Sequence, residues 1–547
     1  MSTAADLVLR NAEIHSLADP DETCEAIAIR DGEIVRLGSD YDVTFLAGTD
    51  TEAIDLEGRV VLPGFIDAHT HLEIVGRRLV HADLSAADSP ADCVALLRET
   101  ADSDEGSGRK PILGYGYDES TWDESRLLTR ENLDEVSTDR PVIAFREDMH
   151  TAGVNSVALD RFRGAMPDDD VRTEGGEPTG VVVEEAIDPL YAATEPARDG
   201  LYELLEAATE RAAELGVTGV HEMIRGSDAP RVYRDLATED ALPIRVRLNY
   251  WSDHLDALTE IGLGTNHGDD FVRVGAIKTF TDGSLGARTA KLTEPYADGS
   301  ADADADINAE RGGDLNGNGI GNDDTTIDDM ATDDTGQWVV SSDDLHELVR
   351  RADEESYQLA AHAIGDAAIE ATLDAYGSET TDPEVARHRV EHAEVLDEEL
   401  IERFAGTGAI ASVQPNFLKW ADSGGLYDER LGESRRRRTN PYADLLDAGV
   451  PLAFGSDCMP LGPLYGVHWA VNAPIERQRL TVTEALRAYT RGAAYAGFDE
   501  DRLGTIEVGK RADLVILDRS PWEHPGEIED IDVSLTVVDG RITHDGR

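Results

Sequence analysis

Two histidines, His69 and His71, end an apolar run that begins at Val60 and is rich in β-branched residues. Such a run predicts a buried strand. Because alternate side chains of a strand point to the same face, both imidazoles aim at one spot beyond its carboxyl end. Neutral imidazole nitrogen binds zinc and similar ions, so the pair is half of a metal site. The alternative is a pair of loop histidines that bind nothing.

Four further polar residues follow apolar, strand-like runs later in the chain: Lys278, His362, His392 and Asp457. Four neutral imidazoles and a carboxylate can hold one or two divalent ions. An ammonium cannot bind a metal, but a lysine amine that has reacted with carbon dioxide becomes a carbamate, which can bridge two ions. Each residue alone has an ordinary alternative as a core or surface side chain, as His221 and His388 do. The joint pattern is much harder to obtain by chance.

Lysine is rare in this chain, with five lysines in 547 residues, so a lysine at the end of a predicted strand is suggestive. Arginine could replace it as a surface charge but does not form the carbamate easily. Lys291 lies nearby and Lys419 follows another predicted strand, which limits the weight of this argument.

The elements that must position these residues alternate between apolar strands and amphipathic helices, such as 201–214 and 342–356, which is typical of parallel α/β proteins. Eight strand–helix units match a TIM (β/α)8 barrel, in which catalytic residues stand at the carboxyl ends of the strands. The eight predicted strands are 60–71, 216–223, 244–250, 272–280, 359–366, 389–393, 409–415 and 451–457.

The two chain ends, 1–58 and 504–547, show short alternating runs separated by turns such as Asp31-Gly32. Neither end has enough strands to bury a sheet alone, so we expect one small composite β-sandwich domain made from both. The barrel then occupies 59–503. Within it, about 73–205 is expected to be an insertion, with strand-like pieces at 111–117 and 141–145.

The chain carries 49 lysines and arginines against 112 aspartates and glutamates, a net charge of −63. The acidic residues are spread through every segment, which favours an acidic enzyme surface over an acidic tail that binds a cationic partner. Such a charge repels itself at low salt and is tolerated when salt screens it. We therefore hypothesise a halophilic protein that works in a high-salt cytoplasm. Nucleic-acid binding is disfavoured, because phosphate contacts need a basic patch.

No apolar run reaches the roughly 18 residues that suggest a membrane span. The first residues lack the basic and apolar regions of a secretory signal. Three distant cysteines, Cys24, Cys93 and Cys458, indicate no disulfide framework and fit a reducing compartment. We expect a cytoplasmic protein.

The segment 299–336 is rich in Asp, Gly and Asn and is expected to be a flexible acidic loop. Its stretch 314–319 also matches the first half of a calcium-binding EF-hand loop. The twelfth position is Thr325 rather than Glu, which disfavours calcium binding and a secreted calcium-binding protein.

The chain resembles the amidohydrolase superfamily over nearly its whole length, and within it the amidohydrolase-3, YtcJ-like group. The stretches that carry the resemblance are 63–71 (PGFIDAHTH), 278–290, 362–366, 389–393 and 455–457, with 150–156 and 174–180 in the insertion.

The resemblance implies a role for each of these positions. His69, His71 and Asp457 would bind one ion, His362 and His392 a second, and Lys278, as a carbamate, would bridge them. The metal is expected to be zinc, as one or two ions. Asp457 would also be catalytic, taking a proton from water and passing it to the leaving nitrogen. The weaker candidates for substrate contacts, for which ion pairing or helix capping is the alternative, are His150, Arg288 and Arg389.

We therefore expect a metal-dependent hydrolase that cleaves a carbon–nitrogen bond of a small molecule, such as an amide, formamide or cyclic amide, with metal-activated water. An ester hydrolase or a deaminase on the same scaffold is the first alternative. A barrel that has lost catalysis and serves as a binding protein is the second. A homodimer is left open.

Overall fold

The computed structural model describes residues 4–547 apart from 104–109, 120, 121, 123, 125, 148–150, 169 and 299–333. These residues form two compact units. The barrel unit contains 4–72, 209–298 and 334–547, and the insertion unit contains 73–208. Among the described residues, no helix is both long and apolar enough to cross a membrane.

Eight parallel strands form the central sheet of the barrel unit, and their order in the sheet is their order in the chain. The two edges of the sheet meet where the Asp457 N–H, just after the last strand, donates to the His69 carbonyl oxygen in the first strand at 2.9 Å. The TIM-barrel prediction is confirmed. The strands are β8 (Phe65–Thr70), β15 (Val217–Ile224), β16 (Arg245–Trp251), β17 (Val272–Phe280), β18 (Leu359–Ala363), β19 (Arg389–His392), β20 (Ile410–Val413) and β21 (Leu452–Phe454).

The first predicted strand, 60–71, is divided at Gly64 and is not continuous. β7 (Val60–Pro63) belongs to another sheet, whereas β8 pairs with β15. A Cβ atom on Gly64 would lie 2.2 Å from Thr218 Cγ2, so only glycine fits this crossing point. Its N–H donates to the Asp513 carbonyl oxygen at 2.9 Å. The chain thus passes directly from the terminal sheet into the barrel.

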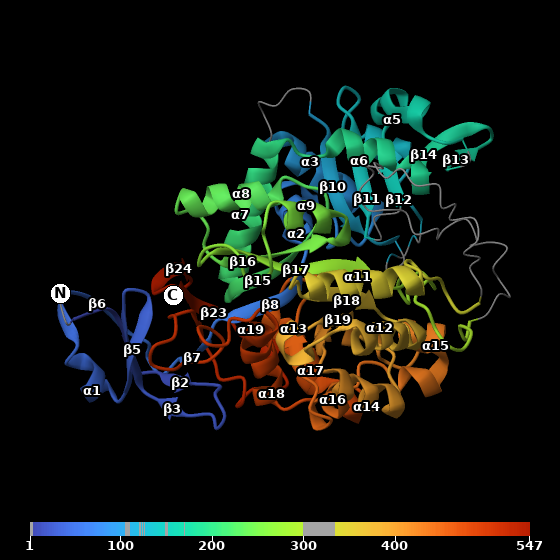
Figure 1. The fold of residues 1–547 in the computed structure, drawn as a ribbon. Helices are drawn as coiled ribbons and strands as arrows, with labels where there is room; N and C mark the ends of the chain where they lie inside the picture. The colour runs from blue at the N-terminus through green and yellow to red at the C-terminus, as the bar shows by residue number, and fades with distance from the viewer. Residues whose placement is uncertain are drawn as a thin grey trace. The chain divides into compact units, whose positions relative to one another are not determined.

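Helices follow the barrel strands and cover the outside of the sheet, as α12 does beside β18 (Figure 1). Side-chain caps fix the starts of α11 and α14: Ser341 accepts from the Asp344 N–H, and Asp397 accepts from the Leu400 N–H. The main helices are α7 (Arg198–Glu214), α8 (Ala229–Thr238), α9 (Leu255–Glu260), α11 (Ser342–Glu354), α12 (Asp366–Glu379), α13 (Pro383–Ala386), α14 (Glu398–Thr407), α15 (Leu426–Arg436), α16 (Tyr442–Asp447), α17 (Pro463–Asn472), α18 (Val482–Arg487) and α19 (Ala493–Ala496).

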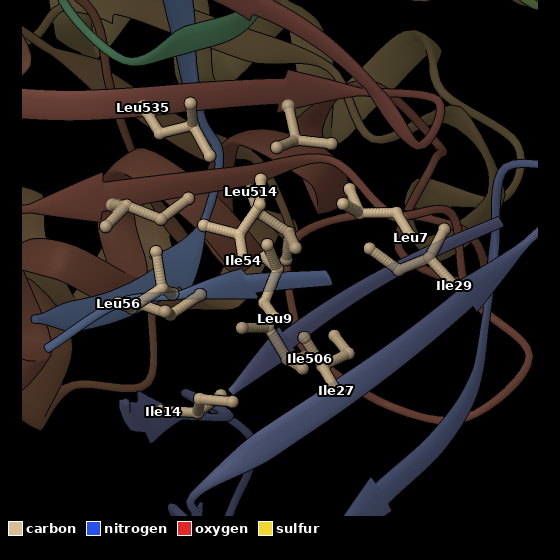
Figure 2. Close-up of a cluster of buried hydrophobic side chains, with 14 of the residues drawn as sticks. Leu7, Leu9, Ile14, Ile27, Ile29, Ile54, Leu56, Ile506, Leu514 and Leu535 are labelled. Carbon is tan, nitrogen blue, oxygen red and sulfur yellow. The ribbon is translucent and has the colours of Figure 1, made fainter. Parts of the chain in front are cut away.

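The two chain ends form a β-sandwich, as expected. One sheet has the order β5-β4-β1-β6 and the other β24-β23-β22-β7-β2-β3, so strands from both ends share the second sheet. Figure 2 shows apolar side chains of the first sheet, such as Leu7 and Ile29, packed against Leu514 and Leu535 of the second. The strands are β1 (Ala5–Arg10), β2 (Glu13–His15), β3 (Thr23–Cys24), β4 (Ala26–Arg30), β5 (Glu33–Gly38), β6 (Ala47–Asp55), β22 (Leu514–Leu517), β23 (Val533–Val538) and β24 (Arg541–Asp545), with helix α1 (Asp40–Thr44) after β5.

The insertion unit has a six-stranded mixed sheet of its own, with the order β13-β14-β12-β11-β10-β9. Its core includes stacked rings of Tyr115 and Phe145 with centroids 5.0 Å apart. The strands are β9 (Ala82–Asp83), β10 (Ile112–Tyr117), β11 (Val142–Arg146), β12 (Thr151–Val154), β13 (Val171–Glu174) and β14 (Glu177–Val183). The helices are α2 (Leu72–Val80), α3 (Pro90–Ser103), α4 (Arg130–Asp134), α5 (Ser156–Phe162) and α6 (Asp188–Thr194). α2 begins in the barrel unit, and α7 begins in the insertion unit and ends in the barrel unit.

Candidate metal centre

The predicted ligands gather at the carboxyl end of the barrel. His69 lies in β8, and His392 is the last residue of β19. Asp457 follows β21 in a turn where its φ is 52°. One potential ligand atom from each of these three residues lies within 4.8 Å of the other two. Strand ends that are far apart in sequence therefore supply a single group of nitrogen and oxygen donors.

The other two histidines flank this group. His71 Nε2 lies 3.3 Å from Asp457 Oδ1. The His362 ring centroid lies 4.5 Å from that of His392. His362 Nε2 is 3.0 Å from the Gly283 carbonyl oxygen, to which it donates, so its Nδ1 is the nitrogen left for another partner. His71 thus neighbours the group on the side of Asp457, and His362 neighbours it on the side of His392.

Lys278 lies in β17 with a side chain that is almost completely buried. Its Nζ has no hydrogen-bond partner among the residues that the structure describes. It lies over the ring of Phe280, whose centroid is 5.0 Å away. An ammonium buried without a hydrogen bond is costly, so the environment favours another form of this amine or a further ligand beside it.

The surroundings keep the four imidazoles neutral. Burial lowers the pKa of His71 to about 4 and that of His362 to about 3, in both cases assisted by the charge of Lys278. Burial also holds the pKa values of His69 and His392 well below the ordinary value. At neutral pH each ring therefore keeps a lone pair with which it can bind a metal.

Lys278 and Asp457 are shifted toward their uncharged forms. Burial lowers the pKa of Lys278 to about 8, against the opposing effect of the Glu391 carboxylate. Burial raises the pKa of Asp457 to about 7, against the opposing effect of Lys278. A neutral fraction of the amine is available near pH 8, as carbamate formation requires.

Two buried carboxylates that sequence reasoning missed hold the backbone around the centre. Asp67 Oδ1 accepts from the N–H groups of His69 at 3.2 Å and Ser456 at 2.9 Å. Glu222 accepts from Thr70 Oγ1 at 2.8 Å and from the Leu72 N–H at 3.0 Å, on either side of His71. The sequence signal that could have identified them is an acidic residue inside a predicted buried strand, because a buried carboxylate must be paired.

Glu391, which pairs with the predicted Arg389, is a third support that sequence reasoning missed. Both side chains are completely buried in β19, and Arg389 Nε lies 2.8 Å from Glu391 Oε1. The second carboxylate oxygen, Oε2, is 2.6 Å from His69 Nδ1. Burial would raise the pKa of Glu391, but the charges of Arg389 and Lys278 hold it below its ordinary value. The carboxylate is therefore ionised and accepts from the His69 ring.

The weaker candidates have partners of their own. Arg389 also donates to the Ala68 carbonyl oxygen at 2.5 Å and to Ser412 Oγ at 2.8 Å. Arg288 forms an ion pair with Asp298 at 2.8 Å. These contacts favour ion pairing over substrate contact for both arginines. His150 and the calcium-like stretch 314–319 lie outside the described residues.

His221 and His388 are core histidines in this structure. His221 Nδ1 lies 2.8 Å from an Arg389 guanidinium nitrogen, and His388 Nδ1 accepts from the Leu359 N–H at 3.0 Å. Burial lowers the pKa of His388 to about 4. Neither belongs to the group of donors formed by His69, His392 and Asp457.

Known proteins resemble this chain in sequence and in structure. The model of the amidohydrolase family named Amidohydro_3 matches residues 52–544. The amidohydrolase YtcJ of Bacillus subtilis (strain 168) is 31% identical over 97% of this chain and 98% of its own. The N-substituted formamide deformylase of Arthrobacter pascens is 27% identical over 100% of this chain and 99% of its own.

A solved structure of a metal-dependent hydrolase from Pyrococcus furiosus is also similar. It is 29% identical, with a TM-score of 0.75, and the match covers 94% of this chain and 99% of that one. The likeness in sequence extends across the barrel, the terminal strands and the insertion. The chain belongs to the amidohydrolase family.

Proposed function

We propose that the protein is a metal-dependent hydrolase that cleaves a carbon–nitrogen bond other than a peptide bond in a small molecule, such as an amide, formamide or cyclic amide. The observation that carries the proposal is the buried group of His69, His392 and Asp457 donors at the carboxyl end of the barrel. Membership of the amidohydrolase family and the likeness to a formamide deformylase support the choice of bond.

The residues present fit a divalent metal. Neutral, buried imidazoles and a carboxylate are the donors that zinc prefers, and a buried His392 Nδ1 has no hydrogen-bond partner among the described residues. We assign His69, His71 and Asp457 to one ion and His362 and His392 to a second, where two are bound. Lys278, as a carbamate, would bridge them. Zinc is the expected metal.

A divalent ion bound there would polarise the substrate carbonyl and lower the pKa of water at the centre towards about 7. The proton transfers depend on the protein's own residues. Asp457 Oδ1, 3.3 Å from His71 Nε2, is placed to take a proton from water and to return it to the leaving nitrogen. Burial of His69, His362 and His392 keeps these imidazoles neutral, so they do not compete for that proton.

The proposal is tested by elemental analysis and by hydrolysis of a panel of amides, formamides, cyclic amides and esters, using protein purified in high salt. We expect one or two equivalents of zinc or a similar ion and product formation with the nitrogen substrates. Asp457→Asn should abolish turnover, whereas the control His267→Gln, which changes an exposed histidine, should not.

Each other outcome supports a different function. Turnover of esters alone would make the protein an ester hydrolase, and ammonia release from an amino-substituted ring would make it a deaminase. Protein that binds no metal under any condition would overturn the catalytic proposal and favour a binding protein on the same scaffold.

A further inference from the structure

Glu391 is a carboxylate with no access to solvent; it lies in β19, the strand that carries His392, and contacts His69 of β8. Arg389 and Glu391 are two residues apart in β19, so both side chains point to the same face, into the barrel. A charge in this position is tolerated only when it is paired and hydrogen-bonded. The groups that pair with Glu391 therefore indicate its role.

The His69 ring lies between Glu391 and the candidate metal centre. Its Nδ1 is 2.6 Å from Glu391 Oε2, and its Nε2 is 3.7 Å from Asp457 Oδ1. The two nitrogens thus face opposite sides. Because the Arg389 guanidinium faces Oε1 and Ser412 Oγ donates to Oε2, the carboxylate is surrounded by donors, so Nδ1 carries the proton and donates it in the hydrogen bond. Nε2 then keeps its lone pair on the side of Asp457 and His392.

Glu391 is itself held in place by two other groups. Arg389 Nε lies 2.8 Å from Oε1, and Ser412 Oγ donates to Oε2 at 2.7 Å. Arg389 also donates to the Ala68 carbonyl oxygen, next to His69 in β8. Strands β8, β19 and β20 are therefore tied together around one carboxylate, which leaves the His69 ring little freedom to rotate.

We propose that Glu391, braced by Arg389 and Ser412, is a positioning residue that fixes the tautomer and orientation of His69 so that Nε2 is presented to the metal. This inference rests on the proposed function, because it concerns a ligand of the proposed metal. Removing the carboxylate should weaken metal binding by about 10- to 100-fold, the usual effect of losing a partner of a metal-binding histidine.

The test compares Glu391→Gln with Asp513→Asn. Asp513 forms a buried pair with Arg245 at 2.7 Å, at the amino-terminal end of β16, so the control makes the same chemical change away from the centre. Zinc affinity is measured by competition with a chromogenic chelator, together with the melting temperature of the metal-free protein, kcat and KM. We expect Glu391→Gln to lose affinity and kcat with KM little changed, and Asp513→Asn to keep all three.

A second variant covers the case in which Glu391→Gln does not fold because Arg389 is left unpaired. The double variant Arg389→Met/Glu391→Gln removes both charges and should show the same loss of zinc affinity. Wild-type affinity in either folded variant would overturn the inference while leaving the proposed function intact. A wild-type protein without zinc affinity would overturn both.

Discussion

Lys278 is one of five lysines in the chain and lies buried among the histidines of the centre. We predict that Lys278→Met, which keeps the apolar stem and removes the amine, lowers the metal content and abolishes any increase of metal uptake by bicarbonate. The physical reason is that the carbamate would supply an anionic oxygen ligand that methionine lacks. Elemental analysis measures the metal, and native mass spectrometry detects the added carbon dioxide.

Lys510→Met is the matched control, because Lys510 Nζ donates to the Glu500 carbonyl oxygen and Thr505 Oγ1 and lies near the terminal strands. It should keep the wild-type metal content. Unchanged metal content in Lys278→Met, with no bicarbonate effect in the wild type, would leave Lys278 without a role as a ligand.

We predict that the buried His388 makes the protein less stable in acid. Its folded pKa is about 4, below the ordinary value of 6.5, because the ring is buried. Below pH 6.5 the unfolded chain therefore binds a proton that the folded chain does not, and the free energy of unfolding falls as the pH drops toward 4. Between pH 7 and pH 5 this group should cost about 2 kcal/mol.

His388→Gln should remove that part of the pH dependence, since an amide does not titrate. The measurement is urea unfolding at both pH values in constant high salt. His267→Gln is the control, because the exposed His267 Nδ1 also accepts a backbone N–H, from Gly264 at 3.1 Å, without being buried. Equal acid sensitivity in wild type and His388→Gln would contradict the prediction.

At this scale the sequence predicts the candidate ligands but not their supports. Each ligand follows its own apolar run, so a local pattern places it at a strand end. Asp67 meets Ser456, which is 389 positions away, and Glu391 meets His69, which is 322 positions away. Such partners meet only when the strands form the barrel, and the local sequence around each residue does not specify which distant residue it will contact.

At the scale of the elements, β21 and β8 close the barrel beside two of the proposed ligands. A Cβ atom on Gly455 would lie 2.5 Å from the His69 backbone nitrogen, which cannot move without displacing the strand. Gly455→Ala should therefore cost about 1–3 kcal/mol of stability and reduce zinc affinity. Urea unfolding and chelator competition measure the two effects.

The control is Gly526→Ala, where a Cβ atom would meet nothing within 4 Å. It should leave both quantities unchanged. A Gly455→Ala protein with wild-type stability and zinc affinity would show that β8 and β21 can separate without disturbing the centre.

The junction between β7 and β8 shows which element boundaries a local sequence pattern does not predict. All eight barrel strands could be predicted, because each is a short apolar run before a helical segment. The break at Gly64 could not, because β7 and β8 are both completely buried and a single residue separates them. What separates them is pairing: β7 pairs with β22, near the other end of the chain, and β8 with β15.

At the scale of the whole molecule, the domain boundaries expected from sequence, 1–58 with 504–547 and 59–503, stay a prediction. β7, at 60–63, pairs within the sheet formed by both chain ends. The composite domain and the barrel are therefore joined by a strand that leads directly into His69.

The net charge of −63 governs how the molecule responds to salt. Acidic residues repel one another in the folded state, and added salt shortens the range of that repulsion from about 10 Å at 0.1 M to about 3 Å at 1 M. We predict that the free energy of unfolding rises between 0.1 M and about 1 M potassium chloride, with most of the gain at the lower concentrations because screening saturates. Urea unfolding at each salt concentration measures this.

Sodium chloride should have the same effect as potassium chloride, and sucrose, which carries no charge, should not reproduce the early rise. A protein that is most stable in dilute buffer would contradict both the prediction and the hypothesis of a high-salt cytoplasm.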